Sequence, residues 1–400
     1  MKNSAVSIIK VEDYDFKKVK QGIIDSLEPF GGISSFVSPG QKVLLKPNLL
    51  SSVTPEKAVT TNPVIISAVV FIVAEAGGKV MIGDSPGVGG FNSVVKATGI
   101  KKIVEESEAV FADFSNECVF ECEENFVGKK LSLAKAVADA DVIISLPKLK
   151  THVQMTMTCA VKNQFGLVLG MEKGQYHFRL KNREALADIM VDINRIAKPA
   201  LAVCDAIDAM EGEGPGGGEP RRLGLILSSP DLMALDVVAC KIIGLNPDSV
   251  PIIQAGKKQK FGKTNLDEIE IIGENLNDVS VQDFKQISNL KGILQILPFP
   301  NFMLGIFRKI WAAKPRIIED KCIKCYKCRD GCPVAPSAID PALPAKNKIN
   351  DKTCIRCYCC HEFCPVKAIA LKQSWIDRTI KITKSMNWFN KIFGRFVPHI

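Results

Sequence analysis

Eight cysteines with one repeated spacing constrain this chain more than any other feature of its sequence. The pattern Cys-x2-Cys-x2-Cys-x3-Cys-Pro begins at Cys322 and begins again at Cys354. Runs with this spacing hold iron–sulfur clusters, and the fourth cysteine of each run ligates the cluster of the other run. We therefore expect two [4Fe-4S] clusters with crossed ligand sets. The first set is Cys322, Cys325, Cys328 and Cys364, and the second is Cys354, Cys357, Cys360 and Cys332.

The two runs are copies of each other beyond their ligands. In each copy a Cys-Pro-Val sequence, at Cys332 and at Cys364, is followed by Ala-Ile. This duplication is similar to the repeat of two-cluster bacterial ferredoxins, so residues 316–372 are expected to form a small α+β ferredoxin-like domain. A structural zinc site uses four ligands in two pairs, which leaves the third cysteine of each run unexplained. Cys359 falls outside the spacing and is expected to be a bystander.

The other cysteines do not indicate a disulfide-rich secreted protein. Residues 1–16 contain charges but no apolar segment of signal-peptide length. The longest apolar run, 64–74, is shorter than the roughly 20 residues of a membrane span. We expect the chain in the cytoplasm, where thiols stay reduced. The net charge of +9 comes with no nucleic-acid recognition motif, so no specific nucleic-acid partner is expected.

Residues 1–288 are expected to form an α/β domain. Short β-branched runs alternate with longer helical stretches, which is typical of an open, doubly wound, mainly parallel sheet. The expected strands are 43–45, 79–83, 141–145, 200–204, 223–228 and 268–272. The expected helices include 63–76, 88–97, 183–197 and 231–243. Asn62 stands in the N-cap position before Pro63, and Ser229-Pro230-Asp231 marks the start of the last of these helices.

Two segments follow a different pattern. Residues 289–315 are apolar but interrupted by proline, and we interpret them as a connector between the domains. Residues 373–400 combine aromatic and basic side chains at helical spacing, which predicts a basic amphipathic helix. Such a helix either packs on the ferredoxin-like domain or makes a peripheral contact with anionic lipid.

Polar and glycine-rich segments follow several expected strands, at the edge where open α/β sheets bind ligands. After strand 79–83 come Gly83, Asp84, Ser85 and Gly87, which could bind an anion or serve as an ordinary turn. After strand 141–145 come the cationic residues Lys148, Lys150, His152 and Lys162. As candidate catalytic residues they could surround a phosphate or carboxylate or polarise a carbonyl, and the alternative is a solvated loop. After strand 200–204 come Asp205 and further carboxylates, which could act as a base, bind a cation or have no role.

In this order, these segments resemble a family known as domain of unknown function 362, which is often fused to ferredoxin modules. The resemblance covers about residues 40–245. The matching sequences are Lys46-Pro47-Asn48, Gly83-Asp84-Ser85-Pro86-Gly87, Pro147-Lys148-Leu149-Lys150-Thr151-His152, Lys162-Asn163-Gln164-Phe165-Gly166 and Asp205-Ala206-Ile207-Asp208-Ala209-Met210-Glu211-Gly212. The resemblance implies the association with iron–sulfur modules and no particular reaction.

Two classes of function remain open. In the first, the chain is an electron-transfer oxidoreductase, and its two [4Fe-4S] clusters exchange electrons with an anionic substrate or a redox partner protein bound by the α/β domain. In the second, the α/β domain is a non-redox enzyme or binds anionic ligands, and the clusters are structural or sensory. Two clusters in tandem favour the first class, because one cluster would be enough to stabilise a small domain.

Overall fold

The computed structural model describes residues 4–87, 90–170, 172–180, 183–286, 314–344 and 348–372. The chain divides into two compact units, residues 1–287 and 288–400. Of the predicted connector only Lys314 and Pro315 are described, and the predicted C-terminal helix over residues 373–400 lies outside the described residues. Among the helices of the described ranges, none is long and apolar enough to cross a membrane.

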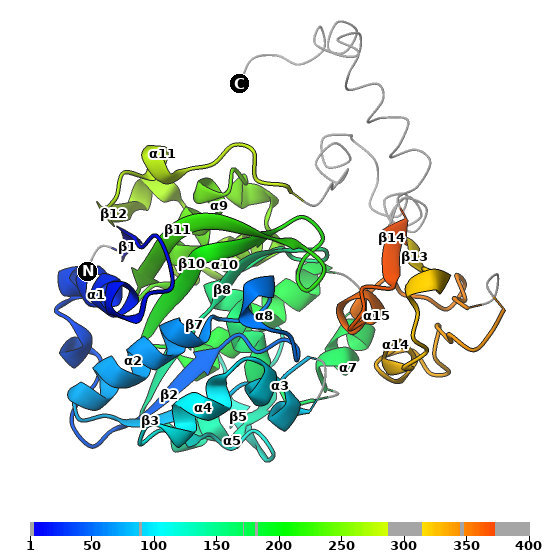
Figure 1. The fold of residues 1–400 in the computed structure, drawn as a ribbon, viewed down its shortest axis with the longest axis horizontal. Coiled ribbons are helices and arrows are strands. Elements are labelled where there is room, and N and C mark those ends of the chain that lie inside the picture. Colours follow the sequence, from blue (N-terminus) through cyan, green and yellow to red (C-terminus); the bar gives the residue numbers. More distant parts are fainter. Residues whose placement is uncertain are drawn as a thin grey trace, which may run out of the picture. The chain divides into compact units, whose positions relative to one another are not determined.

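The first unit is built on a ten-stranded sheet (Figure 1). Its main path has the order β12-β1-β11-β10-β7-β2-β3-β4, and β8 and β9 continue from β10. The strands are β1 (Ser4–Lys10), β2 (Lys42–Pro47), β3 (Lys79–Ile82), β4 (Val110–Phe111), β7 (Val142–Leu146), β8 (Lys148–His152), β9 (Thr156–Thr158), β10 (Leu201–Glu211), β11 (Glu219–Ser229) and β12 (Ile269–Gly273). On the main path every pair is parallel except the two that β11 makes with β1 and β10. The mainly parallel sheet is therefore confirmed.

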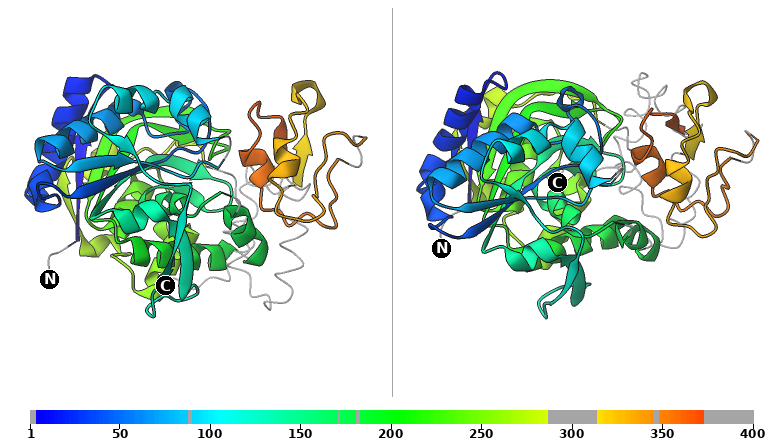
Figure 2. Two further views of the ribbon diagram at one scale, coloured as in Figure 1. Left: turned by 90° about the horizontal axis from the view of Figure 1, so that it is seen from below. Right: turned by 60° about the horizontal axis from the view of Figure 1, so that its bottom comes forward.

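Helices cover both faces of this sheet (Figure 2). A separate apolar core lies between each helical layer and the sheet. Side chains alternate between the cores along β2, because Val43 and Leu45 join one core and Leu44 joins the other. The first layer contains α1 (Phe16–Leu27), α2 (Pro63–Glu75), α3 (Phe91–Ala97) and α4 (Ile100–Glu105). The second contains α5 (Lys135–Asp139), α6 (Ala160–Asn163), α8 (Arg183–Ala197), α9 (Leu232–Ile242) and α10 (Pro251–Gln259). Smaller elements are α7 (Glu172–Arg179), α11 (Leu276–Val279) and a hairpin of β5 (Glu117–Glu121) and β6 (Lys130–Ala134).

The predicted N-cap at Asn62 is confirmed, and Asp231, where the helix was predicted to begin, is the N-cap of α9. The Asn62 side chain accepts the N–H of Val64 at 2.9 Å, with Pro63 in the first turn of α2. Asp231 accepts the N–H groups of Met233 and Ala234 at the start of α9. These side chains satisfy backbone donors that have no partner inside the helix.

The sequence-based prediction of the strands was wrong in two places that matter for function. The strand predicted to end at Cys204 continues as β10 to Glu211, because β11 pairs with it along its length across an irregularity between Ala206 and Asp208. The segment Lys148–His152, expected to leave the sheet after a strand, is itself the strand β8 and pairs with β10. A solvated basic loop is thereby excluded, since all five residues of β8 are buried.

The second unit is small. Its strands β13 (Lys314–Ile317) and β14 (Ile369–Lys372) pair in antiparallel fashion, and Ile339 and Ile349 form a second, isolated antiparallel bridge. Two short helices, α14 (Lys327–Asp330) and α15 (Cys359–Glu362), complete it. The buried residues of its core are Cys328, Ile339, Cys360 and Ile369.

Candidate functional site

The second unit contains two cavities, and four cysteines line each of them. The cysteines of the first are Cys322, Cys325, Cys328 and Cys364. The cysteines of the second are Cys332, Cys354, Cys357 and Cys360. The fold thus groups the eight cysteines into the same two crossed sets that their spacing predicts. Cys359 lies in α15, is buried, and lines neither cavity.

The backbone of each run explains how its thiols come to face one cavity. Lys324 and Tyr326 have φ angles of 51° and 60°, and Arg356 and Tyr358, at the same places in the second run, have 59° and 63°. Non-glycine residues seldom adopt this left-handed conformation. Residues in this conformation flank Cys325 in the first run and Cys357 in the second. They turn the backbone twice within each run, so that successive cysteines line the same space.

The donor set fits the predicted [4Fe-4S] clusters. In the described ranges, no three His, Cys, Asp or Glu side chains are arranged so that they could hold a metal ion. Each quartet surrounds a space that is otherwise mainly apolar, with Ile317 and Ala368 at the first and Ala338 and Ile339 at the second. Four cysteine thiolates around one space are the donor set that a [4Fe-4S] cluster uses.

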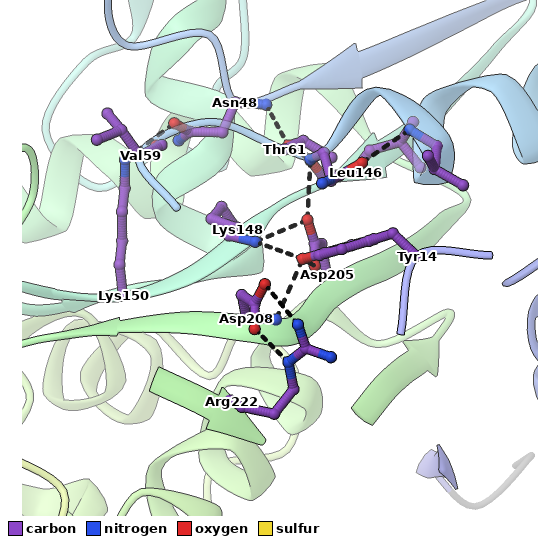
Figure 3. A network of polar contacts seen from close by, with 12 residues as sticks. Tyr14, Asn48, Val59, Thr61, Leu146, Lys148, Lys150, Asp205, Asp208 and Arg222 are labelled. Carbon is purple, nitrogen blue, oxygen red and sulfur yellow. Dashed lines mark hydrogen bonds and ion pairs between the residues drawn. The ribbon is translucent and has the colours of Figure 1, made fainter. Parts of the chain in front are cut away.

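In the first unit, polar side chains converge where β2 and β7 end and β8 begins beside the middle of β10 (Figure 3). At the centre is Asp205, which is fully buried. Its carboxylate accepts hydrogen bonds from Lys148 Nζ at 2.8 Å, the Tyr14 hydroxyl at 2.8 Å and the Asn62 N–H at 2.9 Å. Lys148 Nζ also donates to the Tyr14 oxygen at 3.0 Å. The lysine charge is therefore neutralised within the fold.

Lys150 lies two residues further along β8 and is held differently. Its Nζ donates to Asn48 Oδ1 at 3.0 Å and to the Val59 carbonyl at 2.7 Å (Figure 3). The Asn48 amide then donates to Asn163 Oδ1 at 3.4 Å. Lys46 Nζ donates to the same Asn163 oxygen at 3.3 Å, so Asn48 and Asn163 connect Lys150 to a second charged pair.

That second pair is Lys46 and Asp84, whose Nζ and Oδ1 atoms are 2.8 Å apart and whose side chains are almost completely buried. Burial lowers the pKa of Lys46, and the Asp84 carboxylate opposes this shift. Gly166 allows the close approach, because a Cβ atom at that position would lie 2.0 Å from Asp84 Oδ1. Asp84 also accepts the Leu49 N–H at 2.7 Å, so its carboxylate fixes the chain after β2.

The predicted glycine-rich loop lies against this pair. The Ser85 N–H donates to the Gly166 carbonyl at 3.1 Å, and the Ser85 hydroxyl accepts the Gly170 N–H at 3.0 Å. Lys173, on α7, donates to the Ser85 carbonyl. Burial, together with the charges of Lys46 and Lys162, lowers the pKa of Lys173 to about 7, although Asp84 acts in the opposite direction.

The remaining predicted residues have local roles. Gly83 packs against the Phe114 ring, and the Gly87 N–H donates to the Leu50 carbonyl at 3.1 Å. The Nδ1 atom of His152 accepts the Gln154 and Met155 N–H groups at 3.1 and 3.2 Å and so fixes a turn. Lys162 is half-buried, with Nζ 5.9 Å from the centre of the Phe165 ring.

Four members of the network were not among the predicted site residues, although Lys46 and Asn48 lie in one of the segments that carry the family resemblance. These are Tyr14, Lys46, Asn48 and Lys173. A polar residue directly after a buried strand was the available signal for Lys46 and Asn48. Tyr14 gave no such signal, since its partner Asp205 is 191 residues away in the sequence.

Comparison with known proteins adds a family and a relative. The family described as "Domain of unknown function (DUF362)" matches residues 43–241. The thylakoid-associated protein sll1697 of Synechocystis sp. is 37% identical over 261 residues, which are 65% of this chain and 81% of that protein.

Two solved structures show distant similarity. The lactate racemase apoprotein of Thermoanaerobacterium thermosaccharolyticum has 13% identity and a TM-score of 0.40 over 60% of this chain. A Thermotoga maritima protein has 14% identity and a TM-score of 0.34 over 56%. The chain spans 57% of the length of each of these two proteins.

Proposed function

This chain belongs to the family described as domain of unknown function 362, and we propose that it is an electron-transfer oxidoreductase whose two cysteine quartets each hold a [4Fe-4S] cluster. The observation that carries the proposal is the sorting of eight cysteines into two crossed sets around two cavities. When bound, such clusters supply one-electron transfer at potentials tuned by hydrogen bonds and solvent exposure.

The residues of the second unit hold the clusters and limit the access of water. The thiolates are the ligands, and the backbone N–H of Ala368 donates to Cys364 Sγ at 3.0 Å, an interaction that makes a ligating sulfur less basic. Apolar side chains such as Ile317 and Ile339 line the space around the sulfurs. Fewer water dipoles near a cluster change its reduction potential.

The first unit binds the substrate or partner in this proposal, and the ligand is anionic. Lys173 is the residue that supports this assignment, because the charges of Lys46 and Lys162 help to keep its pKa near 7. An anion beside these lysines favours the protonated form of Lys173. Binding of the anion and uptake of a proton are therefore linked at the loop that contains Ser85.

The alternative is a non-redox enzyme or anion-binding protein with structural or sensory clusters. The same lysine favours it, because a group with a pKa near 7 suits general acid–base chemistry that electron transfer does not require. A redox titration of the anaerobic protein separates the two. If the clusters neither accept nor release electrons at any potential that biological electron donors and acceptors reach, the oxidoreductase proposal is wrong and the alternative stands.

The experiment for the main proposal counts iron and sulfide in anaerobically purified protein. We expect about eight of each per chain, following from two cubane clusters. Cys325→Ser should damage one cluster and leave the electron paramagnetic resonance signal of the other. Cys359→Ser is the matched control and should retain all the iron. Four or fewer irons in the reconstituted wild type, or stoichiometric zinc, contradict the proposal.

We further propose a cytoplasmic location with peripheral membrane contact. It is supported by the basic and aromatic composition of residues 373–400 and by the word "thylakoid-associated" in the name of the relative.

A further inference from the structure

The two cysteine quartets are related by the sequence repeat but differ in exposure. Cys325 is exposed, whereas Cys357, at the same place in the second run, is half-buried. The apolar residue after the first cysteine of each run follows the same trend. Ile323 is 63% exposed and its counterpart Ile355 is 41% exposed. Val366, after the last cysteine of the first quartet, is also exposed. The first cavity is therefore closer to solvent than the second.

The repeat also differs in its charges. Lys324 is exposed. Its counterpart Arg356 is bound by Asp351 at 3.1 Å, and its side chain is only 8% exposed. Three more exposed lysines, Lys321, Lys327 and Lys367, flank the same cysteines.

Carboxylates offset this charge only in part. Glu319 pairs with Lys348, and Asp330 pairs with Arg329 at 3.1 Å. Asp320 is exposed beside Lys321. The stretch that contains Ile323 therefore has an excess of positive charge around an apolar centre.

From this asymmetry we infer that the first rim, consisting of Ile323, Lys324, Cys325, Lys327 and Val366, is the docking site of an acidic one-electron carrier protein. The inference rests on the proposed function. Exposed apolar residues over the thiolates allow close contact, which short-range electron transfer requires, and the lysines attract and orient an acidic surface. With a cluster bound by the first quartet, the reduced carrier would be oxidised by one electron and the cluster reduced by one electron, and no bond would be formed or broken.

The test uses the anaerobic full-length holoprotein and a reduced, acidic plant-type [2Fe-2S] carrier, mixed rapidly at low ionic strength. Lys324→Glu should lower the second-order rate constant of reduction by about tenfold or more, because it reverses a charge at the contact. Lys352→Glu, an exposed lysine near the second run, is the matched control and should change the rate less than about twofold. Ile323→Ser and Ile355→Ser form a second matched pair, of which only the first should slow reduction.

Salt and a small reductant separate this inference from the proposal on which it rests. The wild-type rate should fall as salt rises, and that of Lys324→Glu should fall less. The docking site is wrong if Lys324→Glu and Lys352→Glu have equal effects or if the rate does not depend on salt. The same results are expected if another part of the chain covers the rim, and they exclude the docking site in that case too. If those proteins still contain about eight irons and are reduced by dithionite, the proposed function stands. Missing iron or clusters inert to dithionite overturn both.

Discussion

Lys173 is the residue whose chemistry differs most from that of an ordinary surface lysine. With a pKa of about 7, it is largely deprotonated at a pH at which an exposed lysine is almost fully charged. We predict that acetic anhydride labels Lys173 faster than exposed lysines at neutral pH, with a midpoint near pH 7 in a profile measured by mass spectrometry. Lys162→Met removes a neighbouring positive charge and should move that midpoint to higher pH. Lys101→Met changes an exposed lysine paired with Glu105 and should leave it unchanged.

The sign of the effect of Lys173 on stability follows from the same shift. Its pKa is lower in the folded chain than in the unfolded chain, so the unfolded chain binds more protons between about pH 7 and 10. The contribution of Lys173 to the free energy of unfolding therefore increases as pH rises through this range. Lys173→Met lacks this titrating group, so the difference in free energy of unfolding between the wild type and Lys173→Met should increase with pH over this range. An identical pH dependence of both proteins would contradict the shifted pKa.

Asp205 and Lys148 form a buried ion pair whose contribution to stability can be measured. Asp205→Asn leaves a buried lysine without its counter-charge, and we expect the free energy of unfolding to fall by about 3–5 kcal/mol in urea denaturation. Asp208 is the matched control from the same strand. Its partner Arg222 is half exposed, so Asp208→Asn should cost about 1 kcal/mol or less. A similar loss for both variants would contradict the larger cost expected for removing the counter-charge of a buried lysine.

At the scale of elements, the start of α2 joins local structure to the network. The Asn62 side chain caps the helix, while its backbone N–H donates to Asp205. Asn62→Ala should destabilise the first unit by about 1 kcal/mol, because the Val64 N–H loses its acceptor. Asn62→Ser retains an acceptor and should cost less than half as much, measured by thermal unfolding. Equal losses would assign the effect to something other than capping.

Whether the sequence predicts an element depends on where the partners of its buried side chains lie in the chain. Strands such as β2 and β7 are apolar on both faces, so their own residues reveal them. Strand β8 contains Lys148 and Lys150, whose partners Asp205 and Asn48 come from distant parts of the chain. The local sequence therefore resembles a solvated loop. The extension of β10 likewise depends on its pairing with β11, and no local pattern within residues 205–211 predicts that pairing.

At the scale of the whole molecule, the alternation of strands and helices was enough to predict a doubly wound sheet, but not its strand order. Strand β1 lies between β11 and β12, although about 209 residues separate Lys10 from the start of β11 at Glu219. Such pairing depends on the burial of both faces of the finished sheet, which is a property of the assembled unit. In the second unit the opposite holds. The cysteine spacing alone predicted which distant residues share a cavity, because that geometry is repeated in the sequence.

The last prediction concerns the complete chain and its final segment. Residues 373–400 contain five lysines and arginines and one acidic residue, with tryptophan and phenylalanine among them. Ile382, Met386, Phe389 and Phe393 recur at the spacing of one helical face. We expect the full-length chain to co-sediment with anionic liposomes at low salt, whereas a chain that ends at Lys372 stays in the supernatant. Because the attraction is partly electrostatic, co-sedimentation should weaken as salt rises. Neutral liposomes are the control and should retain less protein, since only the apolar contribution remains. Equal partitioning of the two chains would indicate instead that the segment packs against the protein.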